Sequence, residues 1–135
     1  MKNIALYLVC TLFITFSPVF AQTGTEAPQG PYIKFSENSF DFGDIYQGDT
    51  VSHVFKFKNT GNAPLLLKEV LTTCGCTVPK FSKDPILPGK ESEIVVKFNS
   101  EGKEGRMTKP ITVISNSTNS PARITIITNI LPKKK

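Results

Sequence analysis

The chain has 135 residues, a formal net charge of +5 and three cysteines. This length fits a single domain, which can bury enough surface to fold without a framework of disulfides. The basic character comes partly from the lysine run at residues 133–135, and no basic stripe is interleaved with aromatic residues. Nucleic-acid binding is therefore not expected.

The N-terminus has the pattern of a secretory signal peptide. Lys2 precedes an apolar run over residues 4–16, and the following "SPVFA" ends with Val19 and Ala21 at cleavage-site spacing. The run is too short and too interrupted by proline to span a bilayer. The sequence predicts cleavage after Ala21, loss of Cys10, no transmembrane segment after cleavage, and export to the periplasm, cell envelope or extracellular space.

Composition divides the remaining chain into three parts. Residues 22–31, "QTGTEAPQGP", are polar and rich in Gly and Pro, and they predict a flexible leader. The folded domain is expected over residues 32–131, with a solvated basic tail at 132–135.

Short, alternating apolar segments separated by turn residues predict an all-β domain. In residues 51–59, "VSHVFKFKN", His53 shares one face with Phe55 and Phe57, and lysines occupy the other face. A first strand is expected to begin at Ile33 and Phe35, to be followed by Phe40 and Phe42, and to stop at Gly43. Further strands are expected over residues 51–59, 65–70, 78–81, 94–98, 111–115 and 123–130. The polar stretch "NSEGKEGR" predicts a hairpin loop.

About seven strands over this length predict an immunoglobulin-like β-sandwich with one core between two sheets. The likeness is one of architecture only, because the chain has no tryptophan and no pair of cysteines placed to bridge the sheets. The side chains expected to point inward are Phe55, Phe57, Leu65, Leu67, Ile94, Val96, Phe98, Ile111, Val113, Ile124 and Ile126.

The segments "FDFGDIYQGDTVSHVFKFKNTGNAPL", "TTCGCTVPKF" and "ILPGKESEIVVKFNSEGKEGRMTKPITVISN" resemble DUF1573, a family of exported bacterial domains of unknown function. The first segment is more distantly similar to the immunoglobulin-like domains of the MSP, ASH and HYDIN group and to PapD-like folds. The resemblance implies the fold and no particular activity. It also implies structural roles: Gly43 and Gly48 in tight turns, and Asn59 and Gly61 in closing the following hairpin.

Few residues suit catalysis. His53, the one histidine, is expected to be a hydrogen-bonded core or sheet-edge residue. The carboxylates fit solvated turns, and no hydrolase, phosphate-binding or metalloprotease motif is present. Pro88 and Gly89 predict a further turn. The sequence predicts a protein that is not an enzyme and has no cofactor.

Cys74 and Cys76, with Gly75 between them, are the most distinctive chemical feature. Three interpretations remain open: a local disulfide across the permissive glycine, reduced structural or redox-active thiols, and a soft-metal site for an ion such as Cu(I). His53 is a weak candidate for a third metal ligand, and the chain lacks the four ligands of a structural zinc site.

Two short patterns suggest modification. Asp49-Thr50-Val51 resembles an O-glycosylation triplet of exported Bacteroidetes proteins, so Thr50 is a candidate acceptor. Asn116-Ser117-Thr118 matches the asparagine sequon.

The leading hypothesis is an exported, non-enzymatic immunoglobulin-like module that binds a protein or has a structural role in the cell envelope, with an unknown protein or cell-envelope partner. The alternative is a small thiol-redox or copper-handling protein that uses Cys74 and Cys76. In either case these cysteines are expected in an exposed or half-exposed loop between two strands.

Overall fold

Alternation of apolar and polar residues produces eight strands in two layers. The computed structural model describes residues 29–135. The strands are β1 (Ile33–Phe35), β2 (Ser39–Tyr46), β3 (Thr50–Asn59), β4 (Leu67–Thr72), β5 (Thr77–Phe81), β6 (Glu91–Asn99), β7 (Gly105–Ser115) and β8 (Ala122–Leu131). The first sheet has the order β1-β3-β6-β5 and the second has the order β2-β8-β7-β4. The domain is therefore an all-β, immunoglobulin-like sandwich, as the sequence predicts.

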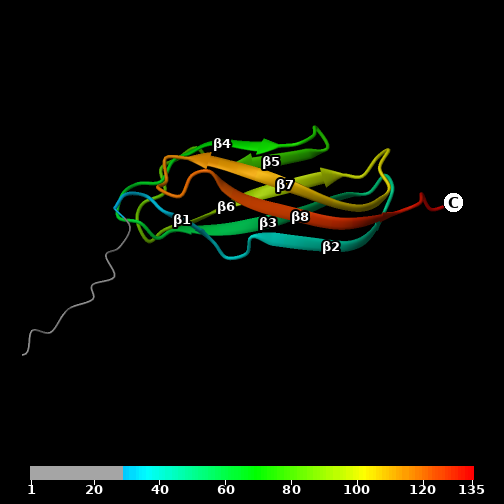
Figure 1. Ribbon diagram of the computed structural model, residues 1–135, viewed down its shortest axis with the longest axis horizontal. Helices are drawn as coiled ribbons and strands as arrows, with labels where there is room; N and C mark the ends of the chain where they lie inside the picture. Colours follow the sequence, from blue (N-terminus) through cyan, green and yellow to red (C-terminus); the bar gives the residue numbers. More distant parts are fainter. Residues whose placement is uncertain (1–28) are drawn as a thin grey trace, which may run out of the picture.

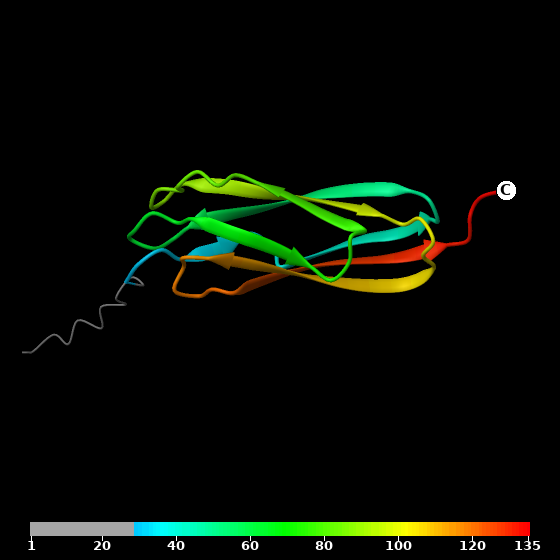
Figure 2. The same ribbon diagram turned by 90° about the horizontal axis from the view of Figure 1, so that it is seen from above.

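The sandwich is elongated, and its long axis separates the two ends of the described chain (Figures 1 and 2). The segment leading into β1 enters at one end, and the C-terminal residues leave from the opposite end. All strand pairs are antiparallel except β2 with β8, which run parallel.

The core lies between the two sheets and contains every side chain that the alternation placed there. Phe55, Phe57 and Phe98 of the first sheet are at most 1% exposed, and they face a layer of isoleucine, valine and leucine from the second sheet. The full set of buried apolar residues is Ile33, Ile45, Phe55, Phe57, Leu65, Leu67, Ile86, Ile94, Val96, Phe98, Ile111, Val113, Ile124, Ile126 and Ile130.

The strand that was expected to stop at Gly43 continues through it to Tyr46. The pairing of β2 with β8 shifts register between Asp41 and Asp44, and Gly43 adopts a φ of +70°. The Gly43 amide donates to the Asp41 carboxylate (2.8 Å), while the Thr128 hydroxyl donates to the Gly43 carbonyl (3.0 Å). Gly43 thus lies in a bulge inside a strand. The strand continues through it because side chains form hydrogen bonds with the backbone groups that the bulge leaves unpaired.

Strand β7 is also longer than expected. It begins at Gly105 and includes Pro110, so the loop after β6 covers only residues 100–104 of the predicted hairpin. Lys109 and Pro110 pair with Ile126 and Thr125 of β8. Polar composition predicted a loop here, but the pairing with β8 holds these residues in the sheet. With β1 and β2 in different sheets, the count is eight strands instead of about seven.

The "NTGN" segment does not close a hairpin, because β3 and β4 belong to different sheets. Asn59 is fully buried and connects three segments at this end of the sandwich. Its Nδ2 donates to the carbonyls of Ala63 and Ile86, both at 2.8 Å, and its Oδ1 accepts from the amides of Gly61 (3.1 Å) and Tyr32 (3.3 Å). The turn residues therefore act as a structural junction that joins the β3–β4 connection to the β5–β6 connection and to the segment before β1.

Gly61 is required at this junction because another chain segment approaches it closely. A Cβ at this position would lie 2.0 Å from the Gly30 carbonyl oxygen. Gly30 accepts a hydrogen bond from the Asn62 amide (3.0 Å), and Pro31 accepts one from Thr118 (2.9 Å). These two residues of the expected leader are bonded to the domain. Residues 22–28 and the expected signal peptide at 1–21, with Cys10, lie outside the described residues.

Candidate functional site

The cysteine loop is the connection that carries the chain from one sheet to the other along one side of the sandwich. Residues 73–76 join β4, the last strand of the second sheet, to β5, the last strand of the first. Figure 1 shows the two strands side by side with the loop beyond their ends. The loop therefore lies where both sheets have an edge.

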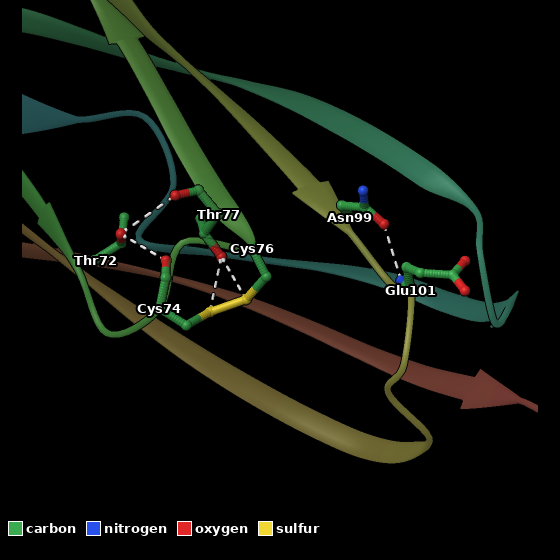
Figure 3. Close-up of a disulfide and its surroundings, with 6 residues drawn as sticks. All are labelled: Thr72, Cys74, Cys76, Thr77, Asn99 and Glu101. Atoms are coloured by element: carbon green, nitrogen blue, oxygen red, sulfur yellow. Dashed lines mark hydrogen bonds between the residues drawn. A yellow bond between two sulfur atoms is a disulfide. The ribbon is translucent and has the colours of Figure 1, made fainter.

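A disulfide joins Cys74 to Cys76, with 5.3 Å between their Cα atoms. Both cysteines are half-buried and Gly75 between them is exposed. The Thr72 hydroxyl stands at the base of the loop, within hydrogen-bond distance of the carbonyl oxygens of Cys74 (3.1 Å) and Thr77 (3.2 Å). Figure 3 shows this hydroxyl between the two ends of the loop, which it ties together.

Thr77 places a second hydroxyl against the disulfide itself. Its Oγ1 lies 3.8 Å from the sulfur of Cys76 and 4.0 Å from that of Cys74, and the residue is 3% exposed. Within residues 29–135 these sulfurs are the only hydrogen-bonding partners found for the Thr77 hydroxyl. The sequence reasoning did not single out Thr77, although it directly follows the cysteines in "CGCT".

The two sulfurs differ in their surroundings. Cys76 is among the partly buried side chains that pack against the hydrophobic core, and Cys74 is not. Gly75 has no positive φ, and a Cβ added there would meet no atom within 4 Å. The fold itself therefore gives no reason for glycine at this position, in contrast to Gly43, Gly48 and Gly89, whose φ angles are positive.

His53 lies apart from the cysteines, against the side of the sandwich where β1 crosses to β2. Its ring stacks on Phe40, with 3.6 Å between centroids and 8° between planes, and meets Phe55 edge-on at 4.9 Å. Its Nε2 contacts the carboxylate of Glu37, in the crossover. The histidine fills a structural position, and no group of three or more His, Cys, Asp or Glu side chains in residues 29–135 could hold a metal ion.

The other candidate positions are separate from one another. Thr50, the candidate glycosylation acceptor, is exposed at the start of β3. Asp41 forms an exposed ion pair with Arg106 (3.3 Å), and the Asn116 side chain bonds to the backbone of Leu66 and Pro64. The expected turn residues and carboxylates therefore do not gather into a catalytic cluster.

The free edge of β5, next to the cysteine loop, has few backbone groups to offer. The Asn99 amide of β6 donates to the Cys76 carbonyl (2.9 Å). Because the backbone groups of alternate residues point toward the partner in an antiparallel pair, those of Thr77 and of every second residue after it point away from β6. The Thr77 amide donates to the Cys74 carbonyl (3.4 Å), its carbonyl faces the Thr72 hydroxyl, and Pro79 has no N–H. This edge is protected against pairing with another strand.

Two further edges are also protected. The edge strand β1 has only three residues. The edge strand β2 carries the bulge at Gly43 and the exposed carboxylates of Asp41 and Asp44. Short length, bulges and charges all disfavour the addition of another strand.

The β4 edge differs from the other three. Lys68 and Glu69 place charges at its start, and the pairing with β7 shifts register between Leu67 and Glu69. Beyond this point, no backbone partner is found on its free side over Val70–Thr72 within the described part of the chain. Leu71 is 47% exposed here. It borders a shallow hollow of about 250 Å³, which is lined by Leu71, Thr72, Thr73, Pro110, Thr112 and Arg123.

A two-sheet sandwich of this strand order defines the class of the domain: it is an all-β, immunoglobulin-like sandwich. Residues 33–130 match the family model described as "Protein of unknown function (DUF1573)". The chain belongs to this family. No curated protein matches the chain.

Solved structures share the fold. A protein of unknown function from Porphyromonas gingivalis W83 is 22% identical with a TM-score of 0.65, over 76% of this chain and 48% of that one. The ASH/PapD-like domain 7 of human CEP192 is 9% identical with a TM-score of 0.62, over 76% and 87% of the two chains. The secreted serine protease VesC of Vibrio cholerae is 15% identical with a TM-score of 0.56, over 74% and 23%.

These similarities concern the fold alone. The chain spans about half the length of the Porphyromonas protein and about a quarter of VesC. Among residues 29–135, no helix has the length and apolar character needed to cross a membrane.

Proposed function

We propose that the chain is an exported, non-enzymatic module that binds an extended segment of a protein partner in the cell envelope along strand β4. The observation that carries this proposal is the stretch Val70–Thr72 of edge strand β4, where the described part of the chain offers no partner to the backbone on the free side. An extended peptide can add to such an edge as a further strand, with main-chain hydrogen bonds for affinity and side-chain pockets for specificity.

The hollow beside β4 indicates which peptide would fit. Leu71 and Pro110 offer apolar contact, and the exposed guanidinium of Arg123 has no ion-pair partner among the described residues. A guanidinium presents a planar set of donors that matches a carboxylate. The preferred partner is therefore an extended segment that alternates apolar residues with Asp or Glu.

Peptide display on the immobilised protein tests this preference. Peptides selected on the wild type should contain Asp or Glu between apolar residues, and Arg123→Glu should weaken their binding about tenfold, since it replaces attraction by repulsion. Leu71→Lys should cost a similar factor. Val54→Lys is the matched control, because Val54 is 37% exposed on the outer face of the other sheet.

In-cell photo-crosslinking provides a second measurement. A photoreactive side chain at position 71 should give a discrete crosslinked partner that is lost with Arg123→Glu, whereas the same group at position 54 should not. Equal binding by wild type, Leu71→Lys and Arg123→Glu, or crosslinks only from position 54, would show that the β4 edge is not the binding site.

A further inference from the structure

Two features of the cysteine loop are not explained by the hydrogen bonds of its backbone. The Thr77 hydroxyl is buried and directed at the two sulfurs, although the backbone of the loop is already tied by the Thr72 hydroxyl. Gly75 is exposed, with an ordinary backbone conformation and open space where a side chain would be. Both features concern access to the disulfide and the charge that develops on its sulfurs.

We propose that the Cys74–Cys76 disulfide is a redox site that exchanges two electrons with a protein dithiol. The incoming thiolate attacks Cys74, Gly75 leaves room for the approaching chain, and the Thr77 hydroxyl stabilises the thiolate of Cys76 as it leaves. This inference goes beyond the proposed binding function and does not depend on it.

The exchange balances as two successive displacements. One thiolate of the partner forms a bond to the Cys74 sulfur as the Cys74–Cys76 bond breaks, and the electron pair of that bond goes to Cys76. The partner's second thiolate then attacks the partner's first sulfur in the mixed disulfide, and Cys74 leaves as a thiolate. The protein ends as a dithiol, the partner as a disulfide, and the two thiolates take protons from water.

The surroundings of the sulfurs favour this direction of attack. Displacement requires the nucleophile to reach one sulfur, and the packing of Cys76 against the core leaves Cys74 as the more open target. The leaving sulfur is then Cys76, which lies within reach of the Thr77 hydroxyl, at 3.8 Å. The hydrogen bond from a hydroxyl to a developing thiolate strengthens as negative charge accumulates on the sulfur.

The first test removes the hydroxyl and keeps the shape of the side chain. Thr77→Val should slow reduction of the oxidised protein by dithiothreitol about tenfold, because a hydrogen bond to the charged leaving group is lost. Thr77→Ser should restore most of the rate. Thr108→Val, the same change at an exposed position of β7, should leave it within twofold of the wild type.

The second test separates access from chemistry. Gly75→Ala should keep the wild-type rate with dithiothreitol to within threefold, but should slow reduction by thioredoxin, a bulky protein dithiol, about tenfold. The unfolding midpoint of each variant, measured without reductant, shows whether its domain remains folded. A purely structural role for Thr77 or Gly75 would change the midpoint without separating these two rates.

The third test identifies the attacked sulfur. In Cys76→Ser, the remaining Cys74 should form a mixed disulfide readily with a single-cysteine thioredoxin under mild oxidation, and in Cys74→Ser the core-packed Cys76 should do so at least several-fold more slowly. Thr77→Val at the wild-type rate, or reduction that occurs only at the rate of global unfolding, would overturn the proposal. Equal trapping by both single-serine variants would overturn the assignment of Cys74.

Discussion

On each side of the sandwich the chain crosses from an edge strand of one sheet to an edge strand of the other, and different contacts hold the two crossings. On one side the chain crosses between sheets from β1 to β2, and there the crossing is held by packed rings: His53 stacks on Phe40, and Phe40 meets Phe42 edge-on at 5.0 Å. On the other side it crosses from β4 to β5, and this loop contains a disulfide and is contacted by two threonine hydroxyls. The first crossing buries apolar surface, and the second leaves the two disulfide sulfurs only half-buried.

The difference shows which crossing the fold depends on. Burial of aromatic rings contributes to stability in proportion to the area removed from water. A disulfide that closes a ring across one residue restricts the unfolded chain very little. The β1–β2 crossing is therefore the structural one, and the β4–β5 crossing is available for chemistry.

The largest expected effect lies in the core that supports both sides equally. Phe57 packs against Phe35 of β1, with 5.6 Å between ring centroids, and Phe98 pairs with Thr77 of β5 beside the cysteine loop. Either change to Ala should lower the free energy of unfolding by about 3 to 5 kcal/mol, since both rings are fully buried. Denaturant unfolding measures this loss. A loss below about 1 kcal/mol at both positions would mean that the strand faces are misassigned.

The next effect compares the two sides directly. Phe40→Ala should lower the free energy of unfolding by about 2 kcal/mol, because it removes a half-buried ring and its stack on His53. Phe81→Ala in β5 is the matched control, a half-buried phenylalanine that packs against the core on the opposite side. It should cost about 1 kcal/mol less, since no aromatic partner is lost there. Equal losses would show that the stacked rings add nothing beyond burial.

The smallest effect is expected at the cysteines. The double change Cys74→Ser with Cys76→Ser should leave the domain folded and lower its stability by no more than about 1 to 2 kcal/mol, because the ring is so short. Unfolding curves of wild type and double variant, each with and without reductant, measure this directly. Collapse of the double variant would make the β4–β5 crossing a structural element as essential as the β1–β2 crossing.

Local patterns were sufficient for most of the fold. Strict alternation in segments such as residues 94–98 predicts which side chains point inward, since a strand places successive side chains on opposite faces. The boundaries were less predictable. Gly43 and Pro110 ordinarily interrupt strands, but here neighbouring strands and side-chain hydrogen bonds accommodate both of them.

The roles of single residues required the tertiary structure. Asn59 belongs to a turn phrase in the sequence, yet its four hydrogen bonds reach partners as far as 27 residues away along the chain. His53 was expected to be a core or sheet-edge residue, but its partners Glu37 and Phe40 could not be named from alternation alone. Contacts between distant segments depend on how the two sheets are stacked, which local periodicity does not encode.

The sequence by itself determined that this protein is a β-sandwich with a Cys-Gly-Cys segment between two strands, because hydrophobic alternation and covalent spacing are local properties of the chain. Only the tertiary structure decided that this segment crosses between sheets, that the backbone of Val70–Thr72 lies at a sheet edge, and that the Thr77 hydroxyl meets the sulfurs. Those facts follow from the order of strands within each sheet, and that order is set by the burial of the whole core and by no single segment of it.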